Sequence, residues 1–133
     1  MEIKFRGKRI DIGEWVYGFH VYFPSLLITK GKSYILKFIG IESGEHIFDW
    51  NEVISETVGE FTGIDDYYES DILSSFSKEI EWFVVYFDKG QFLVKNKFGE
   101  WGTLHKYLEV CKKYDYVPEI IGNIYQNSEL LQN

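Results

Sequence analysis

Polar and apolar residues alternate along most of this chain, which is the pattern of β-strands with one packed and one solvated face. Near the N-terminus Ile3, Phe5 and Gly7 alternate with basic residues, and residues 14–23 form a longer strand rich in aromatic side chains. Gly18 lies inside that strand and predicts a bulge or a close approach of another backbone. Further strands are predicted at residues 26–29, 33–38, 58–62, 72–76 and 120–125.

The strongest strand signal lies at residues 81–87, which are rich in β-branched and aromatic side chains. The turn residues 88–90 follow, and 91–95 have strand character again, so the sequence predicts a hairpin. Residues 30–32 predict a second hairpin loop. Residues 40–57 are less regular, and only a short strand is expected there.

One segment has helical spacing, and Thr103 is its expected N-cap. Its apolar side chains recur at i, i+3, i+4 and i+7, at positions Leu104, Tyr107, Leu108 and Cys111. Cys111 is the only cysteine of the chain, so no intrachain disulfide is possible. We expect it to be a small buried residue of this helix.

These elements predict a mainly β protein made of antiparallel strands with one short helix. From residue 58 onward, about five short strands, tight turns and the helix match the inventory of an SH3-like barrel. Residues 1–57 supply a further antiparallel region with little core of its own. We therefore expect a single domain over residues 1–133, with the barrel region at 58–133.

The net charge and the length of the apolar runs make some classes of function less suitable for this chain. The net charge is −7, with +4 over residues 1–40 and −11 over residues 41–133. A broadly acidic surface disfavours general nucleic-acid binding, because phosphates need a basic face. No apolar run reaches the length of a signal peptide or a membrane span, so we expect a soluble intracellular protein with no membrane partner.

Four motifs in order give the chain a family resemblance. Residues 58–65 read VGEFTGID, residues 69–72 read ESDI, and residues 121–125 read IGNIY before NSELL at 127–131; residues 4–21 form the opening motif. Together they resemble the YopX family of small phage and prophage proteins along nearly the whole chain. In that family the second motif is usually E-G-D-I, so Ser70 stands where glycine is customary.

The resemblance implies an SH3-like barrel in the C-terminal half, a phage origin and residence in the cytoplasm of a bacterial host. It implies no established activity and no cofactor. It therefore supplies no catalytic, cofactor-binding or metal-binding residues.

The residues themselves give few signals for chemistry. The acidic turn with Asp65, Asp66, Glu69 and Asp71 has carboxylates for a hard cation, but its spacing does not fit a calcium loop. A solvated turn is the simpler interpretation, with Asp65 and Asp71 accepting backbone hydrogen bonds. No nucleotide-binding or nucleophile motif occurs, and we expect no enzyme activity.

Interaction surfaces are the remaining candidates. The chain has 25 Phe, Tyr and Trp residues, too many to bury easily in a small β structure, so some are expected to form an exposed patch that contacts protein. The candidate contact residues are the basic cluster Lys4, Arg6, Lys8 and Arg9 and the aromatic residues Tyr67, Tyr68 and Trp101.

We therefore expect a non-enzymatic phage accessory protein that self-associates as a homo-oligomer and contacts an unidentified phage or host protein. The alternative is a single-stranded nucleic-acid-binding protein that uses the basic N-terminal sheet together with neighbouring rings.

Overall fold

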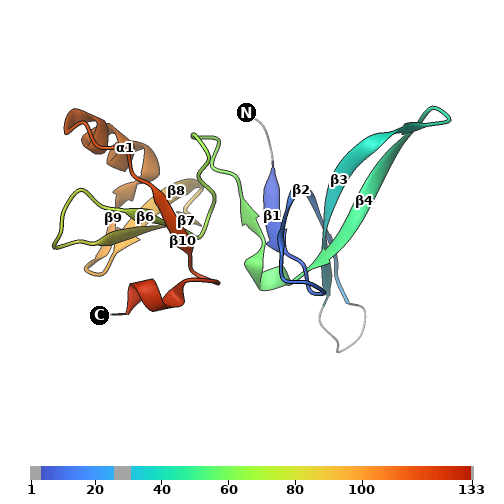
Figure 1. Ribbon diagram of the computed structural model, residues 1–133, viewed down its shortest axis with the longest axis horizontal. Helices are drawn as coiled ribbons and strands as arrows, with labels where there is room; N and C mark the ends of the chain where they lie inside the picture. The colour runs from blue at the N-terminus through green and yellow to red at the C-terminus, as the bar shows by residue number, and fades with distance from the viewer. Residues whose placement is uncertain (1–3, 26–30, 133) are drawn as a thin grey trace. The chain divides into compact units, whose positions relative to one another are not determined.

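The computed structural model describes residues 4–25 and 31–132, and the chain forms two compact units, residues 1–63 and 64–133 (Figure 1). The predicted strand at residues 26–29 lies outside the described residues. Each unit contains one five-stranded antiparallel sheet. The prediction of a mainly β protein with antiparallel strands is confirmed.

The N-terminal unit is a sheet in the order β4-β3-β2-β1-β5. Its strands are β1 (Phe5–Lys8), β2 (Trp15–Phe23), β3 (Lys32–Glu42), β4 (Glu45–Val53) and β5 (Gly59–Glu60), with a 3-10 turn, η1, at Ser55–Thr57. The short strand β5 pairs with β1. This pairing differs from the sequence-based expectation, which assigns residues 58–62 to the C-terminal region.

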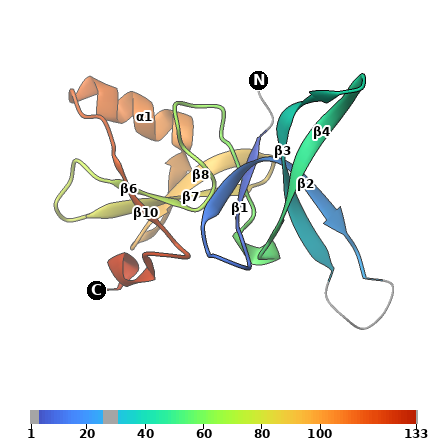
Figure 2. The same ribbon diagram turned by 45° about the vertical axis from the view of Figure 1, so that its right-hand side comes forward.

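The long hairpin of β3 and β4 is the main difference from the sequence-based prediction in this unit (Figures 1 and 2). Residues 40–57 were expected to be irregular, which is wrong for the nine residues of β4. Ser43 and Gly44 form the hairpin turn with φ of 51° and 80°, a conformation that suits two-residue loops. A register shift between Phe38 and Gly40 interrupts the alternation on β3, whereas β4 continues without a break from Phe48 to Ile47.

Gly18 shows the close approach that was predicted for it. A Cβ atom at this position would overlap the main-chain carbonyl oxygen of Leu36 on β3. Only glycine allows β2 and β3 to approach this closely.

The C-terminal unit is a sheet in the order β10-β6-β7-β8-β9 with one helix. Its elements are β6 (Asp71–Ser74), β7 (Trp82–Asp88), β8 (Gln91–Asn96), β9 (Gly99–Thr103), α1 (Leu104–Lys113), β10 (Ile120–Asn123) and the 3-10 turn η2 (Ser128–Leu131). The predicted helix and hairpin are confirmed. Within the described residues no pairing joins the edge strands β9 and β10, so the SH3-like barrel is not confirmed.

The helix begins as its sequence suggests, because the Thr103 side chain accepts a hydrogen bond from the Lys106 main-chain N–H at 3.1 Å. Its apolar side packs onto the sheet and closes the core of this unit. The buried members of that core are Tyr67, Leu73, Phe83, Val85, Val94, Leu104, Tyr107 and Cys111. Cys111 is fully buried as expected, and burial raises the pKa of its thiol.

Ser70 has a left-handed backbone, with φ of 78°. Its main-chain N–H donates to the carbonyl oxygen of Val85 at 2.7 Å, and its carbonyl oxygen accepts from Ile124 N–H at 3.1 Å. The conformation that suits glycine is therefore kept although the residue is serine.

The described part of the chain has no helix that could span a lipid bilayer.

Candidate functional site

The predicted basic cluster does not form an open basic surface. Arg6 is buried, and its guanidinium carbon lies 4.8 Å from the centre of the Trp15 ring. Lys4 lies 5.9 Å from the centre of the Tyr17 ring. These cations stack on rings, which satisfies part of their charge within the unit.

The two other cations of the cluster are also engaged or partly covered. The Arg9 guanidinium donates to Asp11 at 2.6 Å, and this hydrogen bond lowers the pKa of the Asp11 carboxyl. Lys8 is half-buried on β1. The cluster is therefore less available to phosphate groups than its sequence suggests.

The charge asymmetry is smaller when charges are counted for the two structural units, residues 1–63 and 64–133. Residues 1–63 carry seven Lys and Arg against nine Asp and Glu, a net of −2, and residues 64–133 carry seven against twelve, a net of −5. The two values sum to −7. Acidic β4 pairs with β3 in the same unit, so the +4 and −11 halves of the sequence do not correspond to structural units.

The acidic turn packs against the core of the C-terminal unit. Tyr67 and Tyr68 are only 5% and 6% exposed, so the expectation that they belong to an exposed patch is wrong for these side chains. The Asp71 carboxylate is buried and accepts a hydrogen bond from Tyr68 N–H at 2.7 Å, the role predicted for it. Within residues 4–25 and 31–132, no group of three or more His, Cys, Asp or Glu side chains is placed to hold a metal ion.

Trp101 covers the core rather than standing free. Its ring packs edge-on against Phe83 and Tyr107, with centroids 5.9 Å and 5.6 Å away, and it is 36% exposed. The remaining exposed edge can contact a partner only as a small part of a larger surface.

The histidines lie in three separate environments. His20 Nε2 lies 3.2 Å from Ser33 Oγ, and burial lowers the pKa of this imidazole. His105 pairs with Glu109 at 3.0 Å along the helix, and His46 contacts the Phe38 ring on the hairpin. This dispersion gives no pair of imidazoles that could share a metal or a proton.

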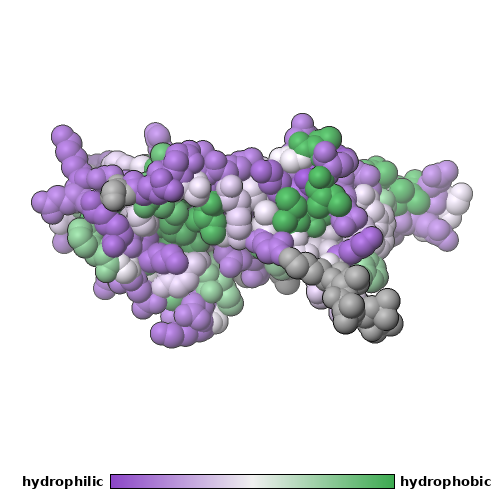
Figure 3. Space-filling view, turned by 90° about the horizontal axis from the view of Figure 1, so that it is seen from below, coloured by the Kyte–Doolittle hydropathy of each residue, from purple (hydrophilic) through white to green (hydrophobic). Residues whose placement is uncertain are grey.

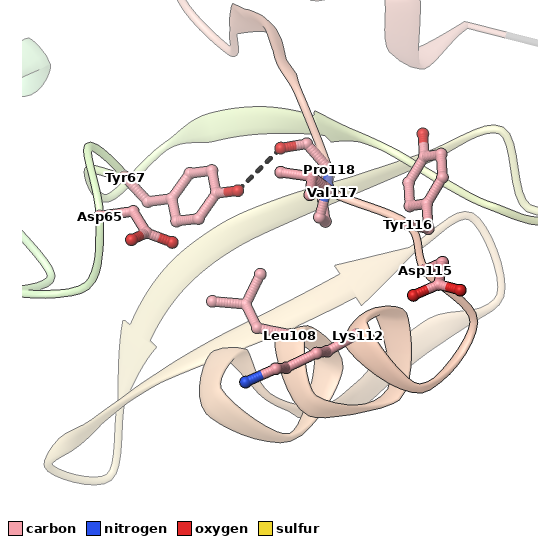
Figure 4. Close-up of a pocket in the computed structure, with 8 residues that line it drawn as sticks. All are labelled: Asp65, Tyr67, Leu108, Lys112, Asp115, Tyr116, Val117 and Pro118. Carbon is pink, nitrogen blue, oxygen red and sulfur yellow. Dashed lines mark hydrogen bonds between the residues drawn. The ribbon is translucent and has the colours of Figure 1, made fainter.

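A shallow cavity of about 400 Å³ opens in the C-terminal unit (Figure 4). Tyr67 forms one wall, held by a hydrogen bond of 2.7 Å from its hydroxyl to the carbonyl oxygen of Pro118. Leu108 points into the cavity from the helix, and Lys112 and Asp65 lie at its rim. The arrangement can accept a small apolar group, but its lining residues include no histidine, cysteine or serine.

A further candidate surface is one face of the N-terminal sheet, which the sequence did not single out. Residues directly opposite each other on neighbouring strands share a face, and Leu36 lies opposite both Phe19 and Trp50. Alternation then places every second residue of β2, β3 and β4 on the same side. We call this surface the aromatic face, and its members are Phe19, Val21, Phe23, Tyr34, Leu36, Phe38, Phe48 and Trp50.

Rings on the aromatic face contact one another across the strands. Tyr34 lies between Phe23 and Trp50, with ring centroids 5.7 Å from each. Phe48 similarly contacts Phe19 at 6.4 Å and Phe38 at 5.7 Å. Pairs of this kind favour a fixed arrangement of the rings, each by about 0.5–1.5 kcal/mol.

The aromatic face is the outer face of the sheet. The opposite side of the same strands contains the buried residues of the unit, including Ile35, Ser33 and Val53. Four rings of the aromatic face are half-exposed: Phe19 at 53%, Phe23 at 49%, Phe38 at 47% and Trp50 at 53%.

Further hydrophobic side chains are exposed near the hairpin turn, among them Ile39 and Ile41. The view in Figure 3 shows one side of the molecule, with hydrophobic (green) patches between hydrophilic regions on both units. Exposed hydrophobic surface is therefore not confined to a single residue or loop.

Sequence alternation alone could not identify the aromatic face, because both faces of β3 contain apolar residues. Ser33 and Asn51 make the other face look solvated in the sequence, so the pattern pointed to the wrong face. Both are buried and hydrogen-bonded, Ser33 to Ser55 at 2.8 Å.

The comparisons with known proteins agree with the motifs of the sequence. No curated protein and no solved structure matches the chain. A family model described as YopX protein matches residues 4–132. The chain therefore belongs to the YopX family.

Proposed function

We propose that this chain is a non-catalytic accessory protein of a phage or prophage that works in the bacterial cytoplasm as a self-associating protein-interaction module. The observation that carries the proposal is the exposed aromatic face of the N-terminal sheet. Its occupant is a second copy of the chain, which packs face to face on the same surface.

The area of the aromatic face supports this assignment. A large ring has roughly 200 Å² of surface, so the four half-exposed rings present about 400 Å². A contiguous patch of this size is often functional on a monomer. Two such patches with their rims approach the roughly 1,000 Å² that a specific interface needs.

The charge of the aromatic face also suits a second copy. On the described residues of β2, β3 and β4, the charged side chains in register with it are Lys32, opposite Phe23, and Glu52, opposite Tyr34. Their charges cancel, so two identical faces can meet without the repulsion that the net charge of −7 would otherwise cause. A two-fold pair of this kind is closed and does not propagate.

Single-stranded nucleic acid is the less favoured occupant. Its bases could stack on the rings, but phosphates need cations beside them. Lys32 is the only cation in register with the aromatic face among the described residues of its three strands, and Arg6 and Arg9 are already engaged.

We also propose that the C-terminal unit is a divergent SH3-like scaffold. Its short antiparallel strands and single helix surround one core, which supports this proposal.

Self-association is tested by sedimentation velocity over a range of protein and salt concentrations. We expect a dimer with a dissociation constant below about 1 mM, with little salt dependence because the aromatic face is nearly neutral. Phe19→Thr should weaken the dimer at least about ten-fold, since threonine keeps strand propensity but removes the ring.

Phe98→Thr is the matched control, because Phe98 is a more exposed ring in the C-terminal unit. It should leave the dimer unchanged. A protein that stays monomeric at about 1 mM, or equal weakening by both variants, would contradict the proposal.

A further inference from the structure

The two described sheets have four edge strands, and β4 is the longest and most regular of them. It has nine residues, whereas β5 has two. The edges β9 and β10 have five and four residues and irregular registers. Proteins usually block an open edge with proline, lysine or a bulge, but β4 contains no proline or lysine, and the bulge of its hairpin lies on β3.

Every second residue of β4 directs its main-chain N–H and C=O away from β3. The carbonyl oxygen of Glu52 accepts from Ile10 N–H at 3.2 Å, on the side opposite β3, which identifies the outward set. His46, Phe48 and Trp50 belong to the same set by alternation. No described strand pairs with β4 on that side at these three residues.

The far end of the same edge already binds a short basic segment of its own chain. Arg9 forms an antiparallel bridge with Val53, and Ile54 N–H donates to the carbonyl oxygen of Lys8 at 2.8 Å. A hollow of about 240 Å³ between this segment and Trp50 marks where the pairing ends and the open edge begins. The edge thus accepts a strand that combines basic and apolar residues.

Side chains give the open edge two different faces. Phe48 and Trp50 belong to the aromatic face, and His46 lies on the same side of the sheet, since its ring also contacts the Phe38 ring. The residues that alternate with them, Glu45, Ile47 and Asp49, lie on the other face. An added strand would therefore meet rings on one side and carboxylates on the other.

We propose that the open edge of β4, residues 45–50, binds an extended segment of a partner protein as an added strand. The segment alternates aromatic or aliphatic residues with Lys or Arg. Its apolar side chains continue the aromatic face, and its cations pair with Glu45 and Asp49. This interaction is separate from self-association and goes beyond the proposed function.

A second β4 fits this edge less well than a basic strand. It would bring its own Glu45 and Asp49 to the face that already carries these carboxylates. Like charges on neighbouring strands destabilise a sheet.

The test uses a capped synthetic peptide, KVKFKVK, added to the full-length protein, with amide hydrogen exchange as the readout. On binding, exchange should slow at His46, Phe48 and Trp50, whose N–H groups face outward. The amides between them already pair with β3 and should change little. Unspecific attraction between a basic peptide and an acidic protein would not give this alternation.

Two controls separate strand addition from charge attraction. A peptide of the same composition in two blocks, KKKKVFV, should bind without alternate protection. His46→Pro removes one outward donor and should weaken KVKFKVK roughly five-fold, while circular dichroism shows the sheet intact.

Several results would overturn the inference. These are no binding, binding without the alternating pattern, or equal binding of both peptides. Protection of the same three amides without peptide, only at high protein concentration, would show that a second copy occupies the edge instead. Self-association is measured separately by sedimentation without peptide, so failure of either proposal can be recognised.

Discussion

Replacing Ser70 by glycine is expected to stabilise the C-terminal unit. Ser70 has φ of 78°, and two main-chain hydrogen bonds, to Val85 and from Ile124, hold it there. An L-residue with a side chain pays about 1–2 kcal/mol for this left-handed conformation. Glycine avoids that cost.

The gain is reduced by the unfolded chain, which is more flexible with glycine by about 0.4–1 kcal/mol. The net expectation is a stabilisation of about 0.8 kcal/mol, which corresponds to roughly 3 °C in Tm for a chain of this size. Urea unfolding followed by circular dichroism measures it as a higher midpoint with an unchanged slope.

Ser70→Ala is the matched control, because alanine removes the hydroxyl but keeps Cβ. It should not stabilise the protein. If alanine stabilises as much as glycine, or glycine does not stabilise at all, backbone strain at Ser70 is not the reason for the effect.

Three other substitutions test separate parts of the structure. Gly18→Ala should cost about 1–3 kcal/mol, because the new methyl group overlaps the β3 backbone; an unchanged urea midpoint would contradict this close approach. Asp71→Ala should cost about 1–3 kcal/mol, since the Tyr68 N–H loses a buried acceptor; the same titration measures it, and a neutral result would refute the role. The hydrogen bond from the Tyr86 hydroxyl to Glu100 raises the pKa of Tyr86 to about 12, above the ordinary 10.0. The stability that this hydrogen bond contributes is therefore complete below pH 10 and is lost as the pH rises towards 12. Tyr86→Phe should remove this fall, seen in urea midpoints across that range, and an identical pH dependence would disprove it.

Local signals in the sequence predicted the helix and the β7–β8 hairpin correctly. Thr103 caps the helix and Cys111 is buried on it, both determined by residues within a few positions. Gly18 was also interpreted correctly, because a glycine inside a strand has few structural reasons to be there.

The candidate site was harder to predict because exposure depends on residues far apart in the chain. Arg6 looked available as a basic residue, but Trp15 on the paired strand covers it. Tyr67 looked exposed in an acidic turn, but Pro118 accepts its hydroxyl hydrogen bond. For β4, both alternating sets of residues mix polar and apolar side chains, such as Trp50 with Glu52, so no one-sided pattern revealed the strand.

The hydrogen bond from Tyr67 to Pro118 joins positions 51 residues apart, and β10 pairs with the much earlier β6. During synthesis the ribosome delivers β6, β7 and β8 well before these partners emerge. Until then β6 lacks its neighbour β10 in the nascent sheet, and the Tyr67 hydroxyl lacks its acceptor at Pro118. The C-terminal unit therefore completes its sheet only after residues 116–124 have been synthesised.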